Sequence, residues 1–171
     1  MLKLFTPNEF TKSVFDIHPE KLVEKGIKGI ITDLDNTLIE WDKPNATPEL
    51  IEWFKGMEKH NIKVTIVSNN NEERVKRFSD PLKIPYIHRA RKPLTTAFGK
   101  ALEVMDLKGD EVVVIGDQMM TDVLGGNRKG LHTILVIPVA STDGFVTRFN
   151  RFVERKIMNH LQKKGVIAWE E

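Results

Sequence analysis

Four nearly continuous hydrophobic runs, rich in β-branched residues, alternate along the chain with segments of helical spacing. Such runs are typical of strands that are covered on both faces of a sheet. They predict strands at residues 27–33, 63–68, 111–117 and 133–137, with a shorter strand at 86–88. The segments between them predict helices at residues 48–60, 71–78, 93–105 and 121–129. This order predicts an α/β fold: a three-layer α-β-α sandwich around a central, mainly parallel five-stranded sheet.

The domain organisation follows from length, because 171 residues suffice for one domain with a sizeable core. We expect the sheet to lie within residues 26–140 and residues 1–25 to form a helical extension. Residues 145–164 predict a long amphipathic helix with a basic polar face. Such a helix either makes peripheral contact with an anionic membrane or packs on the domain core, and the sequence leaves both open.

Composition narrows the classes of function. The net charge is only +2, so no nucleic-acid partner is predicted. The absence of cysteine excludes disulfides, thiolate zinc sites and a cysteine nucleophile. Residues 130–142 form the longest segment without Lys, Arg, Asp or Glu, and this segment is too short to span a bilayer. We therefore expect a cytoplasmic protein that is at most peripheral at the inner face of the membrane.

Two carboxylates, Asp33 and Asp35, end the first predicted strand. They start from the same side of it, because side chains alternate along a strand. Adjacent anions repel each other unless a positive charge lies between them. A hard divalent cation such as Mg²⁺ is the simplest candidate for that charge.

Other reactive side chains also fall at the ends of predicted strands. Ser68 and Asn69 end the second strong strand, Asp117 ends the next one, and Lys92 follows the short strand between them. In open parallel sheets, ligands bind beyond the carboxyl ends of the strands. We therefore expect these residues to converge with the two aspartates on one site.

Such a site predicts phosphoryl transfer. Asp33 is expected to attack phosphorus and form an acyl phosphate, while Asp35 protonates the leaving alcohol and then activates water. Mg²⁺ would be held by Asp33, Asp117 and the backbone carbonyl of Asp35. The Ser68 hydroxyl and the Lys92 ammonium would bind the phosphoryl oxygens.

These residues resemble the motifs of the haloacid dehalogenase (HAD) superfamily phosphatases, which here read Asp33-Leu34-Asp35-Asn36-Thr37, Ser68-Asn69, Lys92-Pro93 and Gly116-Asp117 through Thr121-Asp122. The resemblance implies a Rossmann-like fold and a phosphorylated substrate. It implies the following roles: Asp33 as nucleophile, Asp35 as general acid and base, Ser68, Asn69 and Lys92 as phosphate ligands, Asp33, Asp35 and Asp117 as Mg²⁺ ligands, and Thr37 and Asp122 as supporting residues.

A narrower resemblance is to the YqeG family within the capless group (subfamily IIIA). It rests on residues 89–93 and on the segment from Gly116 to Arg128. That family is related to mitochondrial phosphatidylglycerophosphate phosphatases, which implies a lipid phosphomonoester as one substrate. Loop lengths independently predict that no cap domain is present. About ten residues separate Thr37 from Thr47 and about twenty separate Asn71 from Lys92, whereas a separate lid needs about fifty.

Three alternatives stay open at this point. The substrate is either a lipid or another phosphorylated metabolite or macromolecule. A receiver domain, in which an aspartate accepts a phosphoryl group and signals, also has acidic strand ends and a late lysine. A ribosome-associated binding module is the third alternative, and the oligomeric state is not specified by the sequence.

Overall fold

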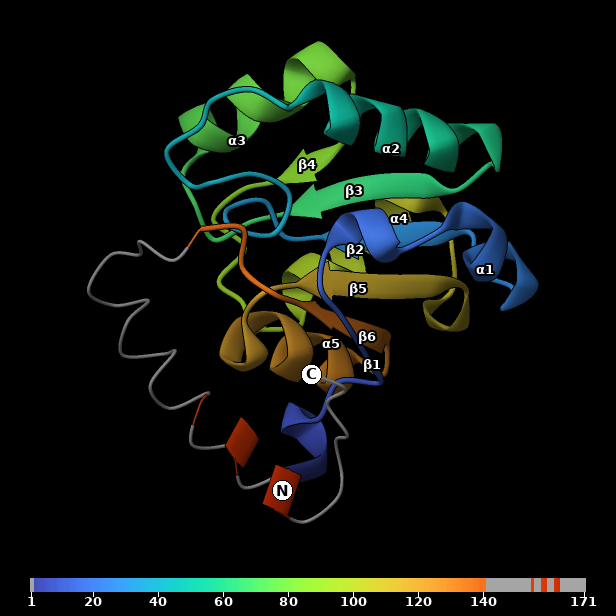
Figure 1. Cartoon of the computed structure of the whole chain (residues 1–171), viewed down its shortest axis with the longest axis vertical. Helices are drawn as coiled ribbons and strands as arrows, with labels where there is room; N and C mark the ends of the chain where they lie inside the picture. Colours follow the sequence, from blue (N-terminus) through green and yellow to red (C-terminus); the bar gives the residue numbers. More distant parts are fainter. Residues whose placement is uncertain (1, 141–154, 156–157, 160–161, 164–171) are drawn as a thin grey trace.

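A computed structural model of the chain describes residues 2–140, 155, 158–159 and 162–163. Its centre is a parallel sheet with the strand order β1-β6-β5-β2-β3-β4. Figure 1 shows the strands stacked in this order, from β4 at the top to β1 at the bottom. The strands are β1 (Glu9–Thr11), β2 (Gly29–Thr32), β3 (Lys63–Val67), β4 (Tyr86–Ile87), β5 (Val112–Gly116) and β6 (His132–Val136).

Helices cover both faces of the sheet. On one face, Trp53 and Phe78 are buried against strand residues such as Ile30. On the other face, Phe98 is buried against Ile31 and its neighbours. The helices are α1 (Pro19–Glu24), α2 (Pro48–Lys59), α3 (Glu72–Ser79), α4 (Thr96–Met105) and α5 (Leu124–Lys129), with short turns η1 (Leu2–Phe5), η2 (Val14–Asp16), η3 (Asp80–Leu82), η4 (Gly109–Glu111) and η5 (Met119–Val123).

The hydrophobic runs explain the central strands. Every residue of β2 and β5 is buried, as expected for strands with helices on both sides. Ile30 pairs with Val113 and faces α2, whereas Ile31 pairs with Val114 and faces α4. The α/β sandwich and its parallel sheet are therefore confirmed.

The predicted number of strands was wrong, because the sheet has six strands and not five. The additional strand is β1, where Phe10 pairs with Leu135 of β6. A strand of three residues is too short to show an alternating pattern, and long-range partners hold it in place. The Asn8 N–H donates to the Thr133 carbonyl at 2.9 Å, and the Thr133 N–H donates back to Asn8 Oδ1 at 2.8 Å.

Two further boundaries differ from the predictions. Helix α4 begins at Thr96 and not at Pro93, because residues 91–94 form a turn in which the Leu94 N–H donates to the Arg91 carbonyl at 3.0 Å. The helix predicted at 121–129 is divided into the π-helical turn η5 and the short helix α5.

The amphipathic helix predicted at 145–164 falls largely outside the described residues. Among the residues that the structure describes, no helix is both long enough and apolar enough to cross a membrane. Residues 33–47 connect β2 to α2 without a helix or a strand, and only η3 and β4 lie between α3 and α4. In the described part of the chain, no additional domain therefore covers the carboxyl edge of the sheet.

Candidate active site

The nucleophile predicted from the sequence lies at the end of the central strand. The Asp33 N–H donates to the Ile115 carbonyl at 2.9 Å, which extends the pairing of β2 with β5 by one residue. Asn36 then adopts a left-handed backbone (φ 63°), which asparagine tolerates better than most residues. Its N–H donates to the Ile39 carbonyl at 2.7 Å and closes a tight loop. The loop leaves the Asp33 carboxylate, which is 9% exposed, at the mouth of the sheet.

Lys92 is the centre of the charge arrangement. Its buried ammonium lies 2.8 Å from Asp33 Oδ1 and 2.7 Å from Asp122 Oδ1. Burial by itself would lower the pKa of Lys92, but the two carboxylates outweigh burial and hold this pKa above its ordinary value. The lysine therefore stays charged and orients the predicted nucleophile.

The carboxyl end of β5 supplies two further aspartates. Thr37 Oγ1 lies 3.0 Å from Asp117 Oδ1 and 3.3 Å from Asp33 Oδ2, so its hydroxyl donates to one or the other carboxylate. Asp122 lies in η5, and this turn brings its carboxylate to Lys92. Burial raises the pKa of Asp122 to about 6, and the Lys92 ammonium acts in the opposite direction. A Cβ on Gly116 would lie 2.2 Å from Asp122 Cγ, so this glycine leaves the room that Asp122 fills.

The side chain of Asp35 points to a different set of partners. Asn70 Nδ2 donates to its Oδ2 at 2.8 Å, and Arg74 Nε donates to its Oδ1 at 3.0 Å. Burial raises the pKa of Asp35, and the charge of Asp33 adds to this, while Asn70 and Arg74 partly oppose it. Neither Asn70, in the loop after β3, nor Arg74 of α3 was predicted, because nothing in these local sequences indicates a contact with Asp35.

The two residues that follow β3 are both at the site. The Ser68 side chain is buried, and its Oγ accepts the Asn70 N–H at 3.1 Å. The Asn69 amide contacts the main chain of Lys92 twice: its Oδ1 accepts the Lys92 N–H at 2.7 Å and its Nδ2 donates to the Lys92 carbonyl at 3.2 Å. Asn69, which the sequence predicts as a phosphate ligand, therefore positions Lys92 in the structure.

The site opens into a cavity of about 350 Å³. Its lining includes Asp33, Asp35, Ser68, Asn69 and Lys92. Trp41, Gln118 and Thr121 also line it. Gln118 and Thr121 lie within the motif segment recognised from the sequence but were given no role there, and Trp41 was not singled out.

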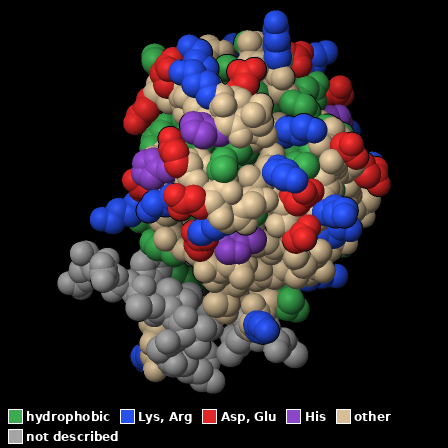
Figure 2. All heavy atoms as spheres, turned by 90° about the vertical axis from the view of Figure 1, so that its right-hand side faces the viewer, with side chains coloured by type: hydrophobic (Ala, Val, Ile, Leu, Met, Phe, Trp, Pro, Cys, Tyr) green, Lys and Arg blue, Asp and Glu red, His purple; other side chains and the backbone are tan. Residues whose placement is uncertain are grey.

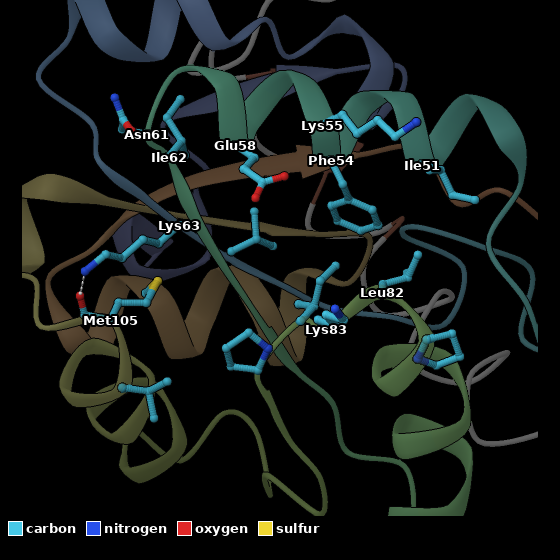
Figure 3. A pocket seen from close by; sticks show the side chains of 15 residues that line it. Ile51, Phe54, Lys55, Glu58, Asn61, Ile62, Lys63, Leu82, Lys83 and Met105 are labelled. Carbon is cyan, nitrogen blue, oxygen red and sulfur yellow. Dashed lines mark hydrogen bonds between the residues drawn. The ribbon is translucent and has the colours of Figure 1, made fainter.

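A larger cleft of about 680 Å³ lies at the amino end of β3 (Figure 3). There, Phe54 and Leu82 point toward the cleft, and Lys63 Nζ donates to the Met105 carbonyl at 2.7 Å. Among the described residues that line the larger cleft, Glu58 is the one acid. This cleft therefore lacks the group of carboxylates that phosphoryl transfer with a bound cation requires. The smaller cavity is therefore the candidate active site.

Comparisons with known proteins agree with this geometry. The family model for haloacid dehalogenase-like hydrolases matches residues 30–90, and a second family model, HAD-hydrolase-like, matches residues 89–138. The probable phosphatase YqeG of Bacillus subtilis (strain 168) is 67% identical over 169 residues, which are 99% of this chain and 98% of that protein. The chain belongs to the YqeG family of HAD phosphatases. The sequence-based prediction of a phosphatase is thereby confirmed.

More distant relatives share the fold or part of the sequence. The phosphatidylglycerophosphate phosphatase 1 of Arabidopsis thaliana is 29% identical over 171 residues, covering 94% of this chain and 49% of the relative. The cobalt-bound deoxy-D-mannose-octulosonate 8-phosphate phosphatase of Haemophilus influenzae superposes with a TM-score of 0.56 at 16% identity, over 85% of this chain and 92% of that one. At this identity, the structural likeness shows the fold alone.

The carboxylates at the site fit the cation that the family uses. Within the described residues, Asp33, Asp117 and Asp122 each offer a carboxylate oxygen, and these oxygens lie within 4.8 Å of one another. Oxygen ligands of this type suit Mg²⁺. Because the single ammonium of Lys92 does not balance three buried carboxylates, a divalent cation would also offset their repulsion. Asp33 and Asp117 of this group were expected as metal ligands from the sequence, and Asp122 was expected as a supporting residue.

Proposed function

We propose that this protein hydrolyses phosphomonoesters with Mg²⁺ through an aspartyl-phosphate on Asp33. The observation that supports this most strongly is the contact of the buried Lys92 ammonium with Asp33 at 2.8 Å. A carboxylate held in this way is oriented toward the cavity and lies next to donors for phosphoryl oxygens, including the Ser68 hydroxyl. Asp35 lines the same cavity, and we assign it the proton exchange with the substrate.

In the first step, an oxygen of Asp33 forms a bond to phosphorus while the ester P–O bond breaks. The leaving alkoxide takes a proton from Asp35, and burial, which raises the pKa of Asp35, favours its acid form. In the second step, Asp35 takes a proton from water and the water oxygen attacks phosphorus. The bond between phosphorus and Asp33 then breaks, which releases inorganic phosphate and restores both carboxyl groups.

Asp33 and Asp117 would hold Mg²⁺, together with the main-chain carbonyl of Asp35. When bound, this ion supplies positive charge that stabilises the phosphoryl oxygens. Asp122 is 2.7 Å from the Lys92 ammonium, so we assign it the task of orienting that lysine.

The first experiment measures phosphate release from a soluble aryl phosphate with Mg²⁺. Asp33→Asn should lower kcat by at least about a thousandfold, because the amide cannot act as the nucleophile. Asp106→Asn is the matched control, since Asp106 is exposed, lies at the end of α4, and has a left-handed backbone (φ 53°) that asparagine also adopts. Full activity of Asp33→Asn would contradict the mechanism.

For the physiological substrate we propose phosphatidylglycerophosphate, which would give phosphatidylglycerol. Two observations support this: the Arabidopsis relative carries that activity in its name, and no described domain closes over the site. The test compares kcat/KM for this lipid in mixed micelles with kcat/KM for a panel of water-soluble phosphomonoesters. A soluble metabolite that is hydrolysed with the higher kcat/KM would refute the lipid assignment and leave the phosphatase mechanism intact.

A further inference from the structure

Several of the large apolar side chains that remain exposed lie on segments that follow the carboxyl ends of strands. Trp41, Leu94, Ile137 and Val139 are 47–52% exposed, and each follows the carboxyl end of a strand, namely β2, β4 or β6. Exposed apolar residues that are scattered singly are normal, but a group of them around one site points to a contact surface.

Hydrogen bonds fix two of these residues next to the catalytic loop. The Trp41 N–H donates to Asn36 Oδ1 at 3.3 Å, and the Val139 N–H donates to the Asn36 carbonyl at 2.8 Å. Trp41 also lines the active-site cavity. Trp41 therefore lies at the rim of the site, and the main chain of Val139 is held against the catalytic loop.

The loop between β4 and α4 adds positive charge at the same edge of the sheet. Exposed and buried residues alternate along this loop: Arg89 and Arg91 are exposed, whereas Ala90 and Lys92 are buried. Both arginines have a left-handed backbone (φ 46° and 56°), which is uncommon for residues other than glycine and is retained where neighbouring structure imposes it. The loop then exposes Leu94, two residues after the lysine that contacts the nucleophile.

Hydrogen bonds hold this loop in its unusual backbone conformation. The Arg89 N–H donates to the Asn70 carbonyl at 2.8 Å, and the Ala90 N–H donates to the Ser68 carbonyl at 3.0 Å. In the described part of the chain, neither Arg89 nor Arg91 forms an ion pair with an acidic side chain. The loop thus offers two cations and one apolar side chain outward.

The opposite edge of the sheet carries the larger cleft, which Val104 helps to line, and a surface of mixed charge. Figure 2 views the molecule from the side of the amino ends of the strands, where Lys and Arg side chains alternate with Asp and Glu side chains. Val23 and Val104 are the exposed large apolar residues on the helices that lead to this edge. They provide matched positions for a control.

We propose that the rim formed by Trp41, Arg89, Arg91, Leu94 and Val139 docks on an anionic lipid surface. The inference rests on the proposed function, because a membrane phosphomonoester reaches the site only if the cavity mouth meets the headgroups. Tryptophan and aliphatic side chains enter the interface, and arginines contact lipid phosphates there. Each arginine near an anionic membrane should raise partitioning about fivefold.

The test uses the full chain and vesicles of phosphatidylcholine with or without an equal share of phosphatidylglycerol. Co-sedimentation should occur with the anionic vesicles and fall on addition of salt. Leu94→Asp should lower the partition coefficient at least tenfold, and Arg89→Gln combined with Arg91→Gln about 25-fold. Val23→Asp and Val104→Asp should not change it. None of these variants should change hydrolysis of the soluble aryl phosphate.

Three results would overturn the proposal: no binding to anionic vesicles, equal losses in the rim and control variants, or binding that does not depend on phosphatidylglycerol. A second copy of this chain is the competing occupant. In that case, sedimentation velocity would show a dimer that Leu94→Asp converts to a monomer, while vesicles fail to bind. Hydrolysis of the soluble substrate by the unmodified protein is scored separately, so failure of docking is distinguishable from failure of the phosphatase mechanism.

Discussion

Replacing Lys92 with methionine should lower the stability of the fold, because the buried carboxylates around Lys92 would then repel each other without a compensating positive charge. The ammonium lies 2.8 Å from Asp33 and 2.7 Å from Asp122, and all three side chains are buried. Methionine has similar length and is apolar, so the cavity stays filled while the charge disappears. The variant then holds several buried carboxylates with no ammonium between them.

The magnitude follows from the two ion pairs. At an effective dielectric constant of about 20, each pair at this distance attracts by about 6 kcal/mol before desolvation is subtracted. Removing one partner from a buried pair typically costs about 3–5 kcal/mol. For a chain of this length, 1 kcal/mol corresponds to about 2–4 °C in Tm. We therefore expect Lys92→Met to lower Tm by about 6–20 °C in metal-free buffer.

The loss should depend on pH in a defined direction. Burial raises the folded-state pKa of Asp122 to about 6, above its unfolded value, so this group takes up a proton on folding and gains stability as pH falls through that range. Lys92 opposes the shift, so its removal should strengthen this proton uptake. The penalty should therefore be large at pH 8 and smaller at pH 5.

Thermal unfolding followed by circular dichroism, at pH 8 and pH 5 with EDTA, measures both effects. Mg²⁺ should restore Tm more in Lys92→Met than in the unmodified protein, because the variant has more uncompensated negative charge. Lys76→Met is the control, since Lys76 is exposed on α3. An unchanged Tm, or an equal loss at both pH values, would refute the reasoning.

Three further outcomes are expected. Gly116→Ala should lower kcat/KM by at least about a hundredfold and Tm by about 2–12 °C, because its Cβ would lie 2.2 Å from Asp122 Cγ; wild-type kinetics would contradict this. Arg74→Met should move the pKa seen in the kcat–pH profile upward, because Arg74 lowers the pKa of Asp35. Arg77→Met on the same helix is the control. A loss of kcat in Arg74→Met that is equal at all pH values, with no shift of the pKa, would argue against this role of Arg74. Removal of divalent metal with EDTA should abolish phosphate release, and Mg²⁺ should restore it; activity that persists in EDTA would exclude the metal requirement.

Much of the fold was predictable because its signals are local. The strands around Ile30 and Val113 are buried on both faces, so their sequences are continuously apolar and need no alternating pattern. The same logic placed Asp33, Ser68 and Asp117 at one edge, since the carboxyl ends of parallel strands meet there. Asp33 and Ser68 line one cavity, and a carboxylate oxygen of Asp117 lies within 4.8 Å of one of Asp33.

The parts of the fold and of the site that were not predicted depend on contacts between segments that are distant in sequence. The bond of Arg74 to Asp35 and the contacts of Asn69 with the Lys92 main chain have no local signature, because each forms only after the strands have paired. The short strand β1 is similar, since its three residues become a strand only through β6. Such contacts are a property of topology and not of composition.

The hydrogen bond from the Val139 N–H to the Asn36 carbonyl joins the segment after β6 to the loop that carries Asp35. Anything that shifts Val139, such as a surface on which it rests, therefore also shifts the loop in which the substrate binds. By thermodynamic linkage, the coupling acts equally in both directions. A substrate that tightens the loop would strengthen attachment at Val139 by the same free energy, so occupancy of the site and residence at a surface would regulate each other.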